Sequence, residues 1–427
     1  MQILHITPHL GGGVGRVLLN YLSKIKDDHR FFHQIACLDY ANAIALAEAI
    51  KIGLTLSDKM AGLRRQLLKM IAAADIVLIH WWNHPLLYDF LVRSKLPPCR
   101  VVMWSHISGF HPPYIFTEKI LHYPDLFVFT TPASFEAKEV TEDLKHKFRV
   151  IWSTSGAEQA KNIKPIAHAG FNVGYIGTVD YCKMHPDFLD ICSQVDIPDA
   201  HFIVCGGPKE KEIQLEAERI GVAGKFDFTG QVVDITKYLS VFDVFGYPLA
   251  PYHYGTCDQA LAESMACGIV PVVFSNKMEN QMVKDGVTGM IVNNKEEYGN
   301  AIKKLYTDRG LKTTLSNNAK AYARRVFTLE VLKKEWEAVF EEMMRFPKIE
   351  RKWEITAKDV FLESLGAYSQ EFLNTMKELS GSPAWQARTR GTVHHYHDFF
   401  PEDKQLALWS KLMEGADVLK QVSQRGN

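Results

Sequence analysis

The sequence predicts an α/β protein with two doubly wound, Rossmann-like domains and a C-terminal helical extension. Three observations support this class. Short apolar runs alternate with amphipathic stretches of helix length, the alternation occurs in two successive series, and the pattern changes after Pro347. With 427 residues the chain is also too long for one ordinary core, since domains average roughly 150 residues.

The first series predicts six buried strands, each bounded by turn residues. They are residues 3–7, 33–38, 75–80, 101–105, 126–130 and 150–153. Strands that alternate with helices in this way form parallel sheets covered on both faces. We therefore expect an N-terminal Rossmann-like domain at residues 1–165.

The second series follows a linker at residues 161–168 and predicts six more strands. They are residues 172–177, 202–205, 226–229, 244–248, 270–274 and 289–292. This series indicates a second Rossmann-like domain at residues 166–327. Residues 309–344 then read as a helix in two pieces, broken near Phe327, where Thr328 resembles an N-cap followed by the acidic Glu330. We expect a closing helix at 328–347.

Residues 348–427 form the predicted helical extension. Amphipathic helices are expected around residues 357–379 and 402–422, separated by an irregular stretch at 380–392. We find no internal repeat in this region and assign it no role.

Composition and charge exclude several classes of function. A hydrophobic fraction of 47% and a charged fraction of 23% are typical of a soluble globular protein. Lys plus Arg equals Asp plus Glu at 49 each, so no global field favours nucleic acid. No stretch has the length and apolarity of a membrane-spanning helix, and the first residues do not resemble a secretory signal. The seven scattered cysteines indicate a reducing compartment, so we expect a cytoplasmic protein.

A glycine-rich segment from His9 to Arg16 directly follows the first predicted strand and precedes an apparent helix at 17–25. Glycines such as Gly12 and Gly13 allow a ligand to approach the backbone, and a helix N-terminus presents unpaired N–H groups to an anion. The spacing is not G-x-G-x-x-G and no acidic residue ends the second strand, which disfavours an NAD site. The alternative is a tight turn that binds nothing.

The most informative stretch is residues 252–268, which is followed by an apolar strand. Its loop contains Gly255, Thr256 and Cys257 and opens a helix at about Cys257, so backbone N–H groups can receive a diphosphate without a metal ion. Glu263 lies in this helix among small and apolar neighbours, where a carboxylate can accept hydrogen bonds from two ribose hydroxyls. The alternative for Glu263 is a solvated helix face.

These residues resemble the family-4 retaining glycosyltransferases, whose two-domain fold is called GT-B. The sequence E-S-M-A-C-G at 263–268, followed by V-P-V-V at 270–273, is similar to the family signature around its second conserved glutamate. Further similar motifs occur in family order at 228–230, 242–245, 285–289 and 327–330. The resemblance covers residues 1–345, is specific in the second domain and loose in the first, and does not extend to the final segment.

The resemblance implies a role for each matching residue in a cleft between the domains. Residues 1–165 would be the acceptor side and 166–327 the donor side. Glu263 would hold the donor ribose, and the loop of Gly255, Thr256 and Cys257 would contact the diphosphate. Gly12 and Gly13 would face the phosphates or the acceptor.

Two further matches supply the predicted catalytic residues. Lys183 lies six positions after Gly177, the family distance to a phosphate-binding lysine, and would neutralise charge on the departing nucleotide. His106 matches a histidine that reaches the sugar. The alternatives are a solvated loop lysine and a histidine satisfied at a strand end.

The implied reaction is transfer of a sugar from a UDP- or GDP-linked donor to a hydroxyl of a glycan or small-molecule acceptor, with retention and without metal or another cofactor. Such a reaction belongs to polysaccharide or glycoconjugate biosynthesis. Two rivals stay open: a non-catalytic GT-B subunit that binds a sugar nucleotide or a partner protein, and a sugar-nucleotide epimerase or phosphorylase on the same scaffold.

Three departures from the family pattern bear on how the sugar is held. Thr178 stands where the family usually has an arginine, and a hydroxyl cannot replace that charge. Gly255 stands where the family often has its first glutamate. A further family glutamate is replaced by Gln281, with Glu279 close by.

Three weaker patterns have mainly structural interpretations. The histidine-rich stretch 394–398 lacks the spacing of a metal site. The basic amphipathic stretch 59–69 suits peripheral contact with the inner face of a membrane, but a helix packed on its sheet with a basic outer face is favoured. The aromatic run 80–84 fits stacking on an acceptor sugar and core packing equally well.

Overall fold

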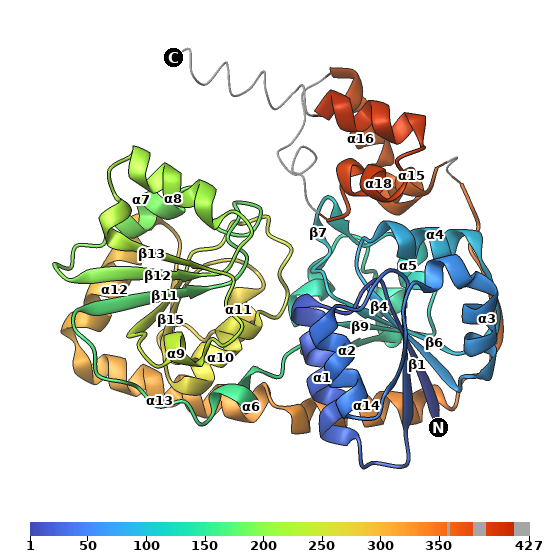
Figure 1. Ribbon diagram of the computed structural model, residues 1–427, viewed down its shortest axis with the longest axis horizontal. Coiled ribbons are helices and arrows are strands. Elements are labelled where there is room, and N and C mark those ends of the chain that lie inside the picture. The colour runs from blue at the N-terminus through green and yellow to red at the C-terminus, as the bar shows by residue number, and fades with distance from the viewer. Residues whose placement is uncertain (357–358, 379–389, 414–427) are drawn as a thin grey trace. The chain divides into compact units, whose positions relative to one another are not determined.

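The computed structural model describes residues 1–356, 359–378 and 390–413. Packing divides the chain into two compact units (Figure 1). Unit 1 comprises Met1–Ile151 together with Glu335–Asn427, and unit 2 comprises Trp152–Lys334. Since this division does not establish which segments fold independently, the predicted domain boundaries stay predictions.

Unit 1 contains a seven-stranded parallel sheet with the order β10-β9-β6-β4-β1-β2-β3. The strands are β1 (Gln2–Thr7), β2 (Phe32–Cys37), β3 (Thr55–Ser57), β4 (Ile76–Trp81), β6 (Val101–Ser105), β9 (Leu126–Phe129) and β10 (Phe148–Val150). The six predicted strands are confirmed, except that β10 begins and ends earlier than predicted. Beyond it, only the Ile151 N–H continues the ladder, to the Phe129 carbonyl. The short edge strand β3 was missed because it has no apolar run.

Helices flank this sheet, and the first of them carries the glycine-rich segment. They are α1 (Gly12–Ile25), α2 (Ala43–Lys51), α3 (Arg64–Ala73), α4 (Pro85–Arg93), α5 (Glu118–His122) and the unit 1 part of α14 (Leu329–Met343). α1 begins earlier than predicted, because Gly12 occupies the left-handed region with φ 61° and turns the chain into the helix after a short connection from β1.

Unit 2 contains a six-stranded parallel sheet with the order β13-β12-β11-β14-β15-β16. The strands are β11 (Phe171–Ile176), β12 (Ala200–Cys205), β13 (Phe226–Gly230), β14 (Val244–Tyr247), β15 (Val270–Phe274) and β16 (Met290–Val292), which confirms all six predicted strands. The helices are α6 (Gly156–Ala160), α7 (Phe188–Ser193), α8 (Glu210–Arg219), α9 (Thr236–Leu239), α10 (Gln259–Cys267), α11 (Glu279–Met282), α12 (Lys295–Thr307) and α13 (Arg309–Val326).

The predicted break between the last two long helices is confirmed. α13 ends at Val326 and α14 begins at Leu329, and the Val331 N–H donates to Thr328 Oγ1 at 3.2 Å. Thr328 therefore caps α14, as its position before an acidic first turn predicts.

The extension packs on unit 1 and is not purely helical. β17 (Ile349–Lys352) pairs antiparallel with β5 (Lys95–Cys99), and the extension helices α15 (Val360–Leu365) and α18 (Val393–Phe399) contact α4 (Figure 1). β17 was missed because the three consecutive charged residues after Ile349 give no apolar signal.

The predicted helix 357–379 is wrong in one respect. The chain forms two helices, α15 and α16 (Ser369–Glu378), because Gly366 at φ 52° turns the backbone between them. Of the predicted irregular stretch 380–392, residues 380–389 lie outside the described residues. The second predicted helix is described from 404 to 413, and its predicted end near 422 lies outside them.

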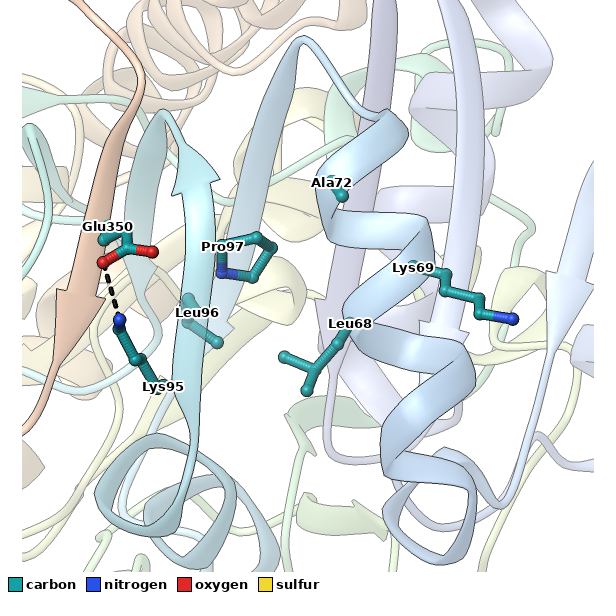
Figure 2. Close-up of a pocket in the computed structure, with 7 residues that line it drawn as sticks. All are labelled: Leu68, Lys69, Ala72, Lys95, Leu96, Pro97 and Glu350. Atoms are coloured by element: carbon teal, nitrogen blue, oxygen red, sulfur yellow. Dashed lines mark ion pairs between the residues drawn. The ribbon is translucent and has the colours of Figure 1, made fainter.

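A surface depression of about 280 Å³ lies between α3 and β5 in unit 1. Figure 2 shows its lining residues, which are Leu68, Lys69, Ala72, Lys95, Leu96, Pro97 and Glu350, with Lys95 paired to Glu350 at 2.7 Å. It contains no predicted site residue.

Candidate functional site in unit 2, with a second set of residues in unit 1

The predicted donor residues of unit 2 gather where the strand order reverses. β11 and β14 are neighbours in the sheet although two strands separate them in sequence, so the segments that follow them meet at one edge. In open α/β sheets such a switch point is the usual place for a ligand. Gly177, Thr178 and Lys183 follow β11, while the loop 248–258 follows β14.

Lys183 is buried and paired within this site. Its side chain is 9% exposed, and Nζ lies 2.6 Å from Asp258 Oδ1 and 5.6 Å from the centre of the Tyr247 ring. Burial alone would lower the pKa of Lys183, but the Asp258 carboxylate, with Tyr254 and Tyr175, raises that pKa above its ordinary value. Lys183 is therefore a buried, ion-paired cation, and the alternative of a solvated loop lysine is wrong.

The loop before α10 is fixed from inside by a histidine that the sequence analysis did not single out. The Gly255 N–H donates to His253 Nδ1 at 3.0 Å, and His253 Nε2 lies 3.0 Å from Glu279 Oε2. Because Nδ1 accepts, Nε2 carries the hydrogen and donates to the carboxylate. A Cβ at Gly255 would lie 2.9 Å from His253 Nδ1, so this brace requires glycine there.

A second departure from the family pattern, Thr178, is part of the same arrangement. Thr178 Oγ1 shares a hydrogen bond of 2.9 Å with the Tyr254 hydroxyl. Thr178 and Gly255 thus both contribute to the position of one loop. The Gly255 N–H is already bonded to His253, so the amides of Thr256 and Cys257 are the better candidates in this loop. Contact of the Gly255–Cys257 loop with a diphosphate stays a prediction.

Helix α10 begins at Gln259 with Asp258 as its N-cap residue, two residues later than predicted. Thr256 and Cys257 precede it and are buried. Glu263 is 1% exposed, which excludes the solvated helix face. Helix α6 packs so closely here that a Cβ at Gly156 would lie 2.8 Å from Glu263 Cγ.

The predicted residues of unit 1 lie at the corresponding edge of its own sheet, where β1 and β4 adjoin. Gly12 and Gly13 begin α1, and a Cβ at either would meet no atom within 4 Å, so the backbone is open to approach. His106 follows β6, and its backbone N–H donates to the Trp81 carbonyl at 2.8 Å. Burial, followed by the nearby His80, lowers the pKa of His106 well below its ordinary value, so His106 is neutral.

The aromatic run 80–84 belongs mainly to the core. Trp81 is fully buried against Tyr88, Phe116 and Phe127, which rules out stacking of its ring on a sugar. Trp82 is also buried, at 4% exposure.

The histidine-rich stretch 394–398 makes structural contacts. His394 Nδ1 lies 2.7 Å from Ser410 Oγ, and His395 Nδ1 accepts from the Gly391 N–H at 3.0 Å. Within the described part of the chain, no group of three or more His, Cys, Asp or Glu side chains is arranged to hold a metal ion.

The basic stretch 59–69 includes most of α3, which buries Leu67 and pairs Arg64 with Asp89 at 2.8 Å while Arg65 and Lys69 face outward. The helix packed on its sheet is thus observed, and membrane contact stays a prediction. None of the helices in residues 1–356, 359–378 and 390–413 is long and apolar enough to cross a bilayer.

The comparisons with known proteins agree with this architecture. Residues 157–322 match the family model "Glycosyl transferases group 1". No curated protein matches the chain in sequence. Solved structures match most of it, and they show one fold. The chain has the GT-B fold.

Three GT-B neighbours illustrate the match. Anabaena HepE in complex with UDP is 17% identical with a TM-score of 0.64, and the match covers 80% of this chain and 100% of HepE. Sucrose-phosphate synthase from Thermosynechococcus elongatus is 14% identical, with a TM-score of 0.60 and coverage of 80% and 99%. The pneumococcal O-GlcNAc transferase GtfA in complex with UDP and GlcNAc is 11% identical, with a TM-score of 0.62 and coverage of 81% and 99%.

The structure thus places Lys183, Thr256, Cys257 and Glu263 around the start of α10 in unit 2, and Gly12, Gly13 and His106 after strands of the unit 1 sheet. That the two sets serve one donor stays a prediction. Sequence reasoning missed Asp258 and the His253–Glu279 brace. Their signal was present as a histidine and an aspartate on either side of Gly255, but only the fold reveals that Glu279 lies beside them.

Proposed function

We propose that this GT-B protein is a retaining glycosyltransferase that moves a hexose or similar sugar from a UDP- or GDP-linked donor to a hydroxyl of a glycan or small-molecule acceptor. The observation that carries the proposal is the buried cation Lys183 beside the N-terminus of α10, at the switch point of the unit that matches group 1 glycosyl transferases. A cation and a helix N-terminus together suit a diphosphate. Neighbours crystallised with UDP and UDP-glucose support the same ligand class.

Lys183 would exchange one anionic partner for another when the donor binds. In the unliganded arrangement its charge is balanced by Asp258 at 2.6 Å. A diphosphate oxygen would take the place of that carboxylate, and the amides of Thr256 and Cys257 would add neutral donors. Glu263 would accept hydrogen bonds from the ribose hydroxyls.

In the transfer step the bond between the anomeric carbon and the phosphate oxygen breaks while a bond to the acceptor oxygen forms on the same face. The acceptor proton passes to the departing phosphate, so no strong protein base and no metal ion is required. Lys183 stabilises the growing negative charge, and neutral His106 donates to a sugar oxygen. Gly12 and Gly13 leave room for the donor or the acceptor.

The rival with structural support is a non-catalytic GT-B subunit. Thr178 and Gly255 are engaged in bracing the loop, and Asp258 already neutralises Lys183. Such a subunit would bind a sugar nucleotide or a partner protein, but no sugar transfer would follow.

Binding and transfer measured together separate these functions. We expect a sugar nucleotide to raise the melting temperature of the wild-type chain and Glu263→Gln to abolish most of that shift, with UDP or GDP release on addition of acceptor. A panel of UDP and GDP sugars that gives no saturable binding would refute the transferase. Binding without hydrolysis or transfer would favour the non-catalytic subunit.

We further propose a cytoplasmic location, with peripheral contact at the inner membrane face through the basic side of α3. All seven cysteines are free thiols, which suits a reducing compartment. Cell fractionation with an Arg65→Glu, Lys69→Glu variant tests the membrane part, since loss of a membrane-bound fraction is expected only if α3 makes the contact.

A further inference from the structure

Four histidines form a continuous line of hydrogen-bonded rings across the sheet of unit 1. His33 lies on β2, His5 on β1, His80 on β4 and His106 directly after β6, and these strands are consecutive neighbours. His33 Nδ1 lies 2.8 Å from His5 Nε2, His5 Nδ1 lies 3.1 Å from His80 Nε2, and His80 Nδ1 lies 3.2 Å from His106 Nε2. We call these four residues the histidine relay.

The register of the sheet explains why the rings meet. His5 is level with Leu78, which lies two residues before His80, and His80 is level with Trp104, which lies two residues before His106. Since side chains alternate between the faces of a strand, a step of two residues keeps each ring on the same face. The relay therefore runs diagonally from the first half of β2 to the carboxyl edge of the sheet, where His106 lies.

The two central rings of the relay are buried, the two end rings are partly buried, and these surroundings favour uncharged rings. His5 and His80 are 1% and 0% exposed, and Phe340 of α14 lies 6.0 Å from the His33 ring. Burial lowers the pKa of His80 to about 3 and that of His33 to about 4. It also lowers the pKa of His5 and of His106 well below the ordinary value. At neutral pH all four rings are neutral.

Neutral rings in this line must share one tautomer. A neutral imidazole carries a single N–H, and a hydrogen bond between two ring nitrogens needs a hydrogen on one of them only. Every link joins Nδ1 of one ring to Nε2 of the next. All three bonds therefore form only if all four rings are Nδ1–H or all four are Nε2–H.

The far end of the relay decides between these arrangements. His33 Nε2 is buried and has no hydrogen-bond partner within the described part of the chain. The Nε2–H arrangement would leave a buried N–H donor without an acceptor there. The Nδ1–H arrangement leaves only an unsatisfied lone pair, which costs less free energy. The nearby charges of Asp28 and the Met1 amino group act on His33 in opposite directions, and the Asp28 carboxylate is engaged by Arg30.

We propose that the histidine relay fixes His106 as a neutral Nδ1–H donor, with His80, His5 and His33 as positioning residues. The role of this donor at a sugar rests on the proposed function. The common tautomer of the four rings does not, because it follows from the hydrogen bonds of unit 1 alone.

Nitrogen NMR of the full-length chain with ¹⁵N-labelled histidine reads the tautomers directly, because protonated and unprotonated ring nitrogens resonate far apart. At pH 7.5 we expect Nδ1 to be the protonated nitrogen in His5, His33, His80 and His106, each assigned from a single substitution. A mixture of tautomers among the four rings of the wild-type protein would overturn the proposal, and this result needs no folded variant.

Substitution at the far end tests the coupling. In His33→Asp an ionised carboxylate only accepts, so His5, His80 and His106 are expected to switch together to Nε2–H. The matched control His33→Asn offers an N–H in the place of Nδ1, so His106 keeps its tautomer. If His33→Asp folds and leaves His106 as Nδ1–H, the relay is refuted. In a His5→Leu background, which interrupts the line, the effect of His33→Asp on His106 should vanish, and persistence would equally refute it.

Activity adds a readout that separates this inference from the proposed function. Switching His106 to the Nε2–H tautomer removes one neutral hydrogen bond from the transition state. We therefore expect His33→Asp to lower kcat for transfer by about tenfold, and His33→Asn to keep the wild-type kcat. The dissociation constant for UDP or GDP should be unchanged, since Lys183 lies in unit 2. Absence of all nucleotide binding would defeat the proposed function while leaving the NMR result to decide the relay.

Discussion

The two units share a sheet topology but arrange polar groups differently inside it. Unit 1 carries a line of neutral histidines through its sheet, linked ring to ring. Unit 2 has a hydrophobic core around its sheet, and its buried charged groups include the Lys183–Asp258 pair and the His253–Glu279 brace beyond the strand ends. One type of fold can thus hold uncharged hydrogen-bond donors in one unit and a buried, ion-paired cation in the other.

Removing the buried cation of unit 2 should have the largest effect. Lys183→Met should weaken binding of a nucleoside diphosphate and reduce transfer by about 100-fold or more, because a charge-assisted contact to phosphate is lost. The change also leaves Asp258 buried without its partner, so Lys183→Met, Asp258→Asn is the matched control for stability. Calorimetry and product release measure the two effects. Equal nucleotide affinity in the double variant and the wild type would contradict the role of Lys183.

Acidification should unfold unit 1 before unit 2. His80 has a pKa of about 3 in the folded protein against an ordinary value of 6.5, so below pH 6.5 the unfolded state binds more protons and stability falls as pH falls. At pH 5 the loss from this residue alone is about 2 kcal/mol.

Tryptophan fluorescence can follow this loss, since Trp152 is in unit 2 and the other six tryptophans of the described residues are in unit 1. Hydrogen exchange by mass spectrometry provides the control for each unit. Equal acid stability of the two units would show that the buried histidines do not set this difference.

Gly255→Ala should be smaller in effect but confined to unit 2. The added Cβ would lie 2.9 Å from His253 Nδ1 and displace the loop, with an expected loss of about 1–3 kcal/mol in the free energy of unfolding. Thermal unfolding measures the change, and Gly13→Ala serves as a control because a Cβ there meets nothing within 4 Å. Similar melting temperatures for Gly255→Ala and wild type would mean that the His253 contact does not constrain residue 255.

Asp258→Asn should have the smallest effect, and it should strengthen nucleotide binding instead of weakening it. Asn keeps the shape and the capping preference of Asp but removes the charge that competes for Lys183, so UDP or GDP should bind about tenfold more tightly. Titration calorimetry at fixed ionic strength provides the dissociation constants. Weaker binding in this variant would show that Asp258 assists the nucleotide and does not compete with it.

The sequence predicted most of the fold because buried parallel strands are apolar runs bounded by turns, and every predicted strand of the two series has a counterpart. The prediction failed for strands that contain no apolar run. β3 and β17 are short and polar, and their pairing partners are set by the tertiary structure. Gly366 was passed over because a helix pattern on both of its sides concealed the turn.

The candidate site was predicted by residue type but not by contact. Lys183 was located from its distance to Gly177, yet nothing in the sequence indicates that Asp258 neutralises it. The histidines of the relay are far apart in the chain, and each by itself resembles an ordinary core residue. Only the order of the strands brings their rings together, so the relay could not be found before the topology was known.

The division of the chain into units has a consequence for synthesis on the ribosome. Unit 2 is one continuous segment, Trp152–Lys334, and all of its residues are available before the chain is finished. Unit 1 is made of the first and the last segments of the chain. The pairing of β5 with β17 and the packing of α4 against α15 and α18 can form only after the last segment is synthesised. Translation therefore begins with unit 1, but unit 1 can complete its fold only after unit 2 has been synthesised.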